Sequence, residues 1–136
     1  MRVVFTDVSV FFDLHTLQIL PEFFGLNWHI QTTDFVFNEI LQANQVRDFD
    51  PFVRSKKLNI ISISVEEEVA IRAKVLREEA RHQKIEVHGS IWVIDQLVKS
   101  DLINKQKAIA LLNKLVTINS RLPMEEIKKQ IEQYKE

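Results

Sequence analysis

The chain has 136 residues, of which 46% are hydrophobic and 27% are charged, values that are ordinary for a globular protein with one sizeable core. Its 18 basic and 19 acidic side chains make no overall electrostatic case for binding nucleic acid or a membrane. The absence of cysteine excludes disulfides, thiolate zinc sites and cysteine nucleophiles.

The sequence carries no targeting or membrane signal that we can identify. No apolar run reaches membrane-spanning length, and the first residues lack a basic start followed by a signal-peptide core. We therefore expect a cytoplasmic protein with no membrane partner and a single domain over residues 1–136. Two glycines, Gly25 and Gly89, are too few for a Gly-rich phosphate loop.

The chain opens with an apolar run, Val3 to Phe5, which is followed by Asp7 and Ser9. An apolar run without polar alternation is typical of a parallel strand that is covered on both faces. Asp7 would then stand just past the carboxyl end of this strand, where open parallel sheets place their chemistry. The alternative is structural, because Asp7 or Ser9 could simply cap the next helix.

That next helix is expected over residues 9–20, with Pro21 and Gly25 ending it. Phe23 and Phe24 are expected in the core, since aromatic side chains dominate protein interiors, although a partner contact is the alternative. We therefore expect this stretch to end the helix and to contribute side chains to the core.

A second strand is expected over residues 29–32, and Thr33 or Asp34 would cap the helix that follows it. Glu39 lies on this helix. Residues 44–57 form the most basic local stretch, and we expect a solvated loop there with one helical turn over residues 51–54.

A third apolar strand is expected over residues 58–63. Ser64 and Glu67 then match a capping box, which predicts that a helix begins there and runs to about Arg81. A short fourth strand is expected over residues 85–87. Further helices are expected over residues 91–100, from Asn104 and from Pro123. This alternation predicts an α/β protein with three layers, in which helices cover both faces of a short, mostly parallel sheet of about four strands.

Three acidic residues fall where such a sheet would gather them. Asp7 follows the first strand, Glu39 lies on the helix after the second, and Glu67 (or its neighbours Glu66 and Glu68) opens the helix after the third. Clustered carboxylates need a counter-ion, and hard oxygen ligands suit Mg²⁺ or Mn²⁺. The structural alternatives are a capping-box role for Glu67 and a solvated helix face for Glu39.

Four stretches carry a resemblance to a known family: residues 3–9, 33–40, 64–71 and 89–103. The first has a strand, Asp7 and then Ser9, and the second has Val36 before the helical pair Glu39-Ile40. The third and fourth are similar to a Gly-Glu-x-x-Ala-Ile segment and a Gly-Thr-hydrophobic segment. In this order the stretches resemble PIN-domain proteins, small metal-dependent ribonucleases that include many toxins of toxin–antitoxin pairs.

This resemblance implies a PIN-like fold in which Asp7, Glu39 and Glu67 are catalytic and hold Mg²⁺ or Mn²⁺. Ser9 would support the site by hydrogen bonding around Asp7. The implied reaction is the hydrolysis of RNA phosphodiester bonds by metal-activated water. The implied partners are RNA and a small antitoxin-type protein, and the last helix would permit a homodimer.

The chain departs from this branch of the family in one respect. An apolar strand ending in Asp-Asp is missing between the helix that begins at Ser64 and the segment at Gly89. Asp95, on the helix over residues 91–100, is the candidate substitute for that fourth acid. The alternative function is a degenerate, non-catalytic PIN-like module that binds RNA or a protein partner. A general α/β interaction protein with incidental acids is the third hypothesis.

Overall fold

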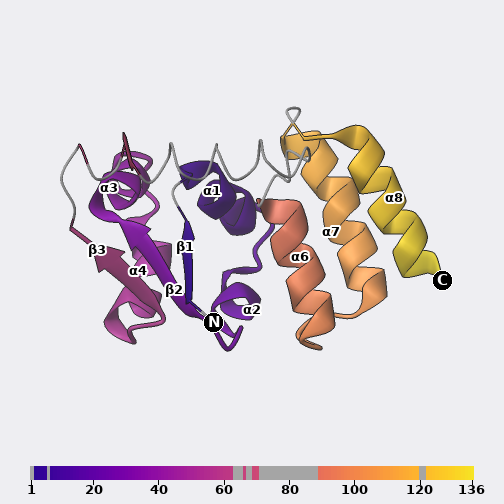
Figure 1. The fold of residues 1–136 in the computed structure, drawn as a ribbon, viewed down its shortest axis with the longest axis horizontal. Coiled ribbons are helices and arrows are strands. Elements are labelled where there is room, and N and C mark those ends of the chain that lie inside the picture. Colours follow the sequence, from indigo (N-terminus) through magenta and orange to yellow (C-terminus); the bar gives the residue numbers. More distant parts are fainter. Residues whose placement is uncertain (1, 6, 63–65, 67–68, 71–88, 120–121) are drawn as a thin grey trace. The chain divides into compact units, whose positions relative to one another are not determined.

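The computed structural model describes the chain except residues 1, 6, 63–65, 67–68, 71–88 and 120–121. The described residues form an α/β fold with a small parallel sheet (Figure 1). In chain order its elements are β1 (Arg2–Phe5), α1 (Val8–Thr16), α2 (Leu20–Phe24), β2 (His29–Thr33), α3 (Asp34–Gln42), α4 (Val46–Arg54), β3 (Leu58–Ile61), α6 (Ser90–Lys99), α7 (Lys105–Ile118) and α8 (Met124–Lys135).

The chain divides into two compact units. We call residues 1–8 and 27–86 the sheet unit, because they include β1, β2 and β3. Residues 9–26 and 87–136 are the helical unit, with α1, α2, α6, α7 and α8.

The described strands of the sheet unit pair in the order β1-β2-β3, and both pairings are parallel. Arg2 lies opposite His29, and Ile30 lies opposite Leu58. This pairing confirms the parallel sheet expected from the sequence. The predicted fourth strand over residues 85–87, the capping box at Ser64 and most of the helix after it lie outside the described residues.

Burial alternates along β1 and most of β2, whereas β3 has one buried residue, Leu58, followed by three half-buried residues. Phe5, Ile30 and Leu58 are buried, and α3 and α4 pack against the sheet with buried Ile40 and Phe49. The alternate positions are largely polar and more exposed; they are Arg2, Val4, His29, Gln31 and Asn59. The strands therefore bury one face well, whereas the apolar runs had indicated strands that are covered equally on both faces.

Two expected elements differ in extent. The segment predicted as one helix over residues 9–20 forms α1 and then α2, and Pro21 lies in the first turn of α2 rather than ending a helix. Proline is tolerated there because the first N–H groups of a helix have no intrahelical acceptor. The stretch predicted as a loop over 44–57 contains α4, which the fully buried Phe49 holds in the core despite Pro51.

Four helices end in the same way, without glycine. Gln18, Asn44, Lys56 and Asp101 each have a positive φ just past α1, α3, α4 and α6. After α1, the N–H of Ile19 donates to the Leu14 carbonyl and the N–H of Gln18 to that of His15, the two bonds of a Schellman motif. The same pair of bonds closes α3, α4 and α6.

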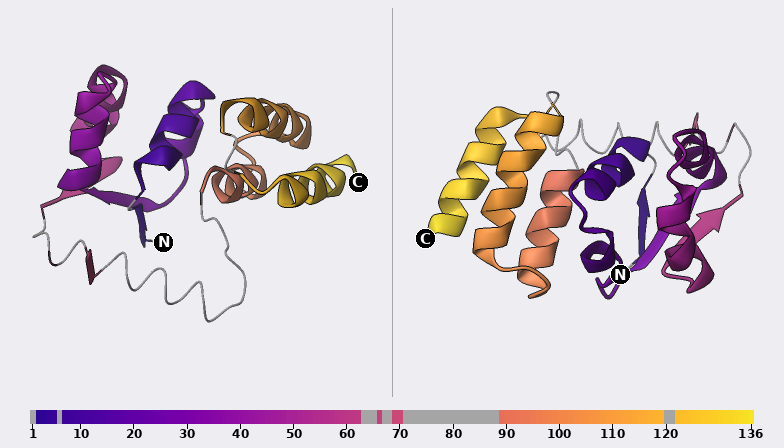
Figure 2. Two further views of the ribbon diagram at one scale, coloured as in Figure 1. Left: turned by 90° about the horizontal axis from the view of Figure 1, so that it is seen from above. Right: turned by 180° about the vertical axis from the view of Figure 1, so that it is seen from behind.

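In the helical unit, α6, α7 and α8 run side by side, as both views of Figure 2 show. Asn104 caps α7 as predicted, and its side chain accepts a hydrogen bond of 2.7 Å from the Lys107 N–H. Pro123 occupies the N-cap position of α8, one residue before the predicted place. Fully buried side chains fill the core of this unit: Phe11, Leu14, Ile19, Phe23, Ile94, Leu97, Leu112 and Leu115.

A buried carboxylate links three helices of this unit. Asp13 on α1 is 9% exposed, and its Oδ2 accepts hydrogen bonds from the Ser90 hydroxyl (2.7 Å) and the Asn119 side-chain amide (3.1 Å). Ser90 is the first residue of α6, and Asn119 is the C-cap of α7. Because a carboxylate is costly to bury without donors, these two bonds specify how α1 meets α6 and α7.

Candidate functional site

The carboxyl ends of the three parallel strands lie at one edge of the sheet, and polar residues follow each strand there. Asp7 comes two residues after β1, Asp34 directly follows β2, and Ser62 directly follows β3. This is the edge at which open parallel sheets place ligands. Asp7 is exposed and occupies the position just before α1, whereas Ser9 lies inside α1 and is not at the cap position.

Asp34 is the acid at this edge that the sequence reasoning missed. The Thr33 hydroxyl accepts a hydrogen bond of 3.2 Å from the Val36 N–H, so Thr33 is the cap of α3 and Asp34 is its first residue. Asp34 Oδ2 accepts a hydrogen bond of 3.2 Å from the Ser62 hydroxyl, which joins the ends of β2 and β3. Asp34 Oδ1 is buried and has no hydrogen-bond partner among the residues that the structure describes. Buried carboxylate oxygens in proteins usually have a partner, which is a protein donor, an ordered water or a cation.

The sequence already contained a signal for the position of Asp34 at the end of β2. Thr33 and Asp34 are adjacent candidates for one cap, and a helix start needs only one of them. If Thr33 is the cap, Asp34 becomes the first helical residue, directly after the strand. Because Thr33 caps the helix, the carboxylate of Asp34 is available to accept a hydrogen bond from Ser62.

Glu39 lies in the second turn of α3 and is exposed. It is five positions beyond Asp34, and a helix rotates by about 140° over that interval. The two acids of α3 therefore leave the helix in different directions. Val36 and Ile40, which flank Glu39 on the helix, are the residues that face the core.

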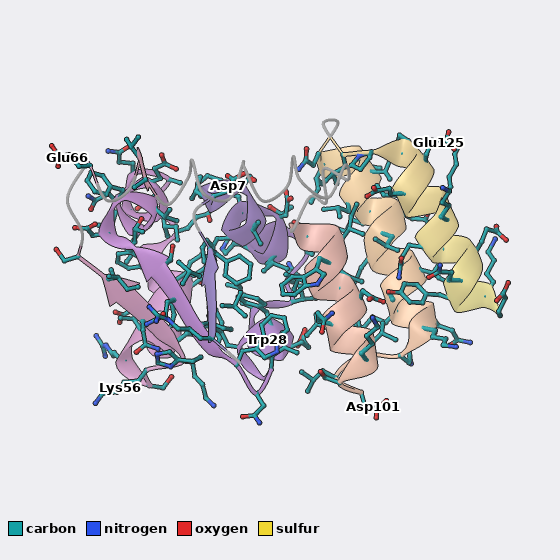
Figure 3. The ribbon with its side chains drawn as sticks, viewed as in Figure 1. Asp7, Trp28, Lys56, Glu66, Asp101 and Glu125 are labelled. Carbon is teal, nitrogen blue, oxygen red and sulfur yellow. The ribbon has the colours of Figure 1, made fainter. Side chains whose placement is uncertain are left out.

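The third predicted acid, Glu67, lies outside the described residues. Its neighbour Glu66 is helical and exposed, and Figure 3 shows that Glu66 and Asp7 do not lie side by side. Within the described ranges, no group of three or more histidine, aspartate or glutamate residues could hold a metal ion. The oxygen donors at this edge suit Mg²⁺ or Mn²⁺ in kind.

Asp95, the candidate substitute acid, belongs to a hydrogen-bonded cluster in the helical unit. Its Oδ1 accepts bonds from the Tyr134 hydroxyl (2.8 Å) and the Gln130 amide (2.9 Å), and its Oδ2 pairs with Lys99 at 3.0 Å. Burial raises the pKa of the Tyr134 hydroxyl above its ordinary value, and the neighbouring Asp95 carboxylate raises it further. Asp95 Oδ1 thus holds α8 against α6, whereas its Oδ2 is paired within α6.

Comparison with known proteins adds no relative. No protein-family model, curated protein or solved structure matches the chain. Among the helices that the structure describes, none is long and apolar enough to cross a membrane.

Proposed function

We propose that this chain is a PIN-like protein, with the three-layer architecture of that family, that hydrolyses RNA phosphodiester bonds with the help of Mg²⁺ or Mn²⁺. The observation that supports this most is the parallel pairing of β1, β2 and β3. It brings the strand ends that precede Asp7 and Asp34 to a common edge, with Glu39 on the helix that follows β2.

In this proposal Asp7, Glu39 and Glu67 hold the cation, which when bound supplies positive charge for the phosphodiester and a water of lowered pKa. Asp34 contributes a further carboxylate at the same edge, and its hydrogen bond to Ser62 fixes the orientation of that carboxylate. Ser9 supports Asp7 through a hydrogen bond in the family pattern, and this role stays a prediction. Antitoxin-type and homodimer partners also stay predictions.

The first test is the thermal melting of the protein in a titration with Mn²⁺ or Mg²⁺. A cation that binds only the folded chain stabilises it by about 2.7 kcal/mol at a hundred times its dissociation constant. We expect this gain in the wild type and its loss in Asp7→Asn. Asp101→Asn is the matched control, because Asp101 is exposed in the helical unit and asparagine accepts its positive φ.

The same variants test the reaction. Wild type and Asp101→Asn should cleave single-stranded RNA with Mn²⁺, and EDTA or Asp7→Asn should abolish the cleavage. Cleavage that survives both EDTA and Asp7→Asn would exclude the metal mechanism. A melting temperature that no divalent cation changes would exclude the proposed site itself.

The second candidate function is a non-catalytic PIN-like module that binds RNA or a protein partner. It is favoured by the lack of a three-acid group among the described residues and by the engagement of Asp95 in a structural cluster. RNA binding in EDTA without cleavage in Mn²⁺ would support this second function over the first.

A further inference from the structure

The amino-terminal edge of the sheet, opposite to the edge of Asp7, gathers basic residues. Arg2 begins β1, His29 begins β2 and Lys57 directly precedes β3. Arg2 pairs with His29, and Ile30 pairs with Leu58, so the register continued by one residue sets Lys57 opposite His29. Neighbouring strands lie about 4.8 Å apart, so these three residues form a row across the sheet.

The row is accessible to solvent. Its members Arg2, His29 and Lys57 are all exposed, as is Lys56, which directly precedes Lys57. Residues opposite each other in parallel strands project to the same face, and Gln31, which accepts a hydrogen bond from Arg2 Nε, continues that face. The basic row is therefore the end of the polar face of the sheet.

The described segments beside the row carry no excess of acidic residues. Helix α4 contains two acids and two arginines, and one pair of them, Arg54 and Asp50, forms an ion pair at 2.8 Å. Helix α4 therefore has no net formal charge. The segments that lead into β2 and β3, residues 27–29 and 55–57, contain no acid.

Lysines at a helix end also have a structural explanation, because cations stabilise the carboxyl terminus of a helix. Lys56 and Lys57 directly follow the last turn of α4 and its C-cap Ser55. This explanation covers the two lysines and does not cover Arg2 and His29, which belong to strands that start beside them.

We propose that this amino edge, defined as Arg2, His29, Lys56 and Lys57, binds the phosphate backbone of single-stranded RNA. A linear row of cations suits a linear chain of phosphates. Half-buried Trp28 precedes His29 and lies at the same end of the sheet unit as Lys56, as Figure 3 shows. Aromatic side chains beside cationic grooves are typical of single-strand binding, whereas an acidic peptide has no bases to stack on them.

The proposal rests on the proposed function only in the choice of RNA, since the binding itself needs no metal. The experiment measures fluorescence anisotropy of a fluorescein-labelled oligouridine with the full chain, in EDTA, over a range of salt concentrations. For single strands the logarithm of affinity falls with the logarithm of salt by about 0.7 per phosphate contact. Lys56→Gln/Lys57→Gln should therefore reduce the slope by about 1.4.

The matched control is Lys128→Gln/Lys129→Gln, another adjacent pair of exposed lysines, on α8. Glutamine is suitable at position 56 because Gln18 already occupies the equivalent place after α1 with a positive φ. The control should keep the wild-type slope. An unchanged slope in the Lys56/Lys57 variant, or an equal reduction in both variants, would overturn the proposal.

Two further measurements locate the RNA and identify the ligand. In a Trp92→Phe background, Trp28 is the single tryptophan, and its emission should change when oligouridine binds. Binding without any change at Trp28 would place the RNA elsewhere and overturn the proposal. Polyglutamate that displaces oligouridine as well as unlabelled RNA does would overturn the assignment to nucleic acid. Because all arms contain EDTA, a failure here is distinguishable from a failure of catalysis.

Discussion

Asp13 is a buried carboxylate whose two donors come from distant parts of the chain, Ser90 and Asn119. Its removal would leave the Ser90 hydroxyl, which is 2% exposed, without its acceptor. An unsatisfied buried polar group costs about 1–3 kcal/mol, in addition to the lost hydrogen bonds. The residue is thus more important for stability than its place in a short helix indicates.

We expect Asp13→Ala to lower the free energy of unfolding by about 2–4 kcal/mol, measured by urea denaturation. Ser90→Ala should cost less when it is introduced into Asp13→Ala than into the wild type, because the hydroxyl then has no acceptor to lose. Additive losses in this double-mutant cycle would contradict an energetic link between the two side chains.

Four helices end in a left-handed residue that is not glycine, in a chain that has two glycines. Schellman motifs usually carry glycine at the left-handed position, and Gln18, Asn44, Lys56 and Asp101 occupy it here. An L-residue in this conformation is disfavoured by roughly 1–2 kcal/mol, and asparagine and aspartate tolerate it best. Of these four residues, Gln18 and Lys56 are therefore the two whose side chains fit the left-handed conformation least well.

Gln18→Gly should raise the free energy of unfolding by about 0.5–1 kcal/mol, because the relief of strain exceeds the added freedom of the unfolded chain. Asn44→Gly is the matched change at the end of α3 and should give a smaller gain, since asparagine already accepts a positive φ. Chemical denaturation of both variants measures the difference. A loss of stability in Gln18→Gly would show that the glutamine side chain itself contributes to the helix end.

The near-neutral total of 18 basic and 19 acidic residues conceals a separation of charge in the sheet unit. Asp7 and Asp34 follow strands, while Lys57 precedes one and Arg2 begins another. Strands of four residues separate the two edges by about 13 Å, which exceeds the screening length of about 8 Å at physiological salt. The two edges should thus bind their ligands independently.

We therefore expect Asp7→Asn to leave the affinity for oligouridine in EDTA unchanged. Lys56→Gln/Lys57→Gln should likewise leave the metal-induced rise in melting temperature unchanged. In the combined variant the two losses should add, because the sites share no partner. Coupling between them, seen as a combined loss that differs from the sum, would indicate one continuous site.

Local sequence signals were enough to predict most elements and the class of fold. The alternation of apolar strands and helices predicted the parallel sheet, and the caps Thr33 and Asn104 lie where their residue types indicated. These features depend on neighbours within one or two turns of the chain. Propensity and spacing carry that information directly.

Other features depended on contacts between distant segments, which no local pattern contains. The pairing of β3 with β2 places Lys57 beside His29. The hydrogen bond between Ser62 and Asp34 joins residues that are 28 positions apart. Phe49 makes a helix of a polar stretch because its burial outweighs the cost of Pro51. Burial and pairing arise only once the chain has folded, so the polar edges of the sheet and the partner of each carboxylate became visible in three dimensions.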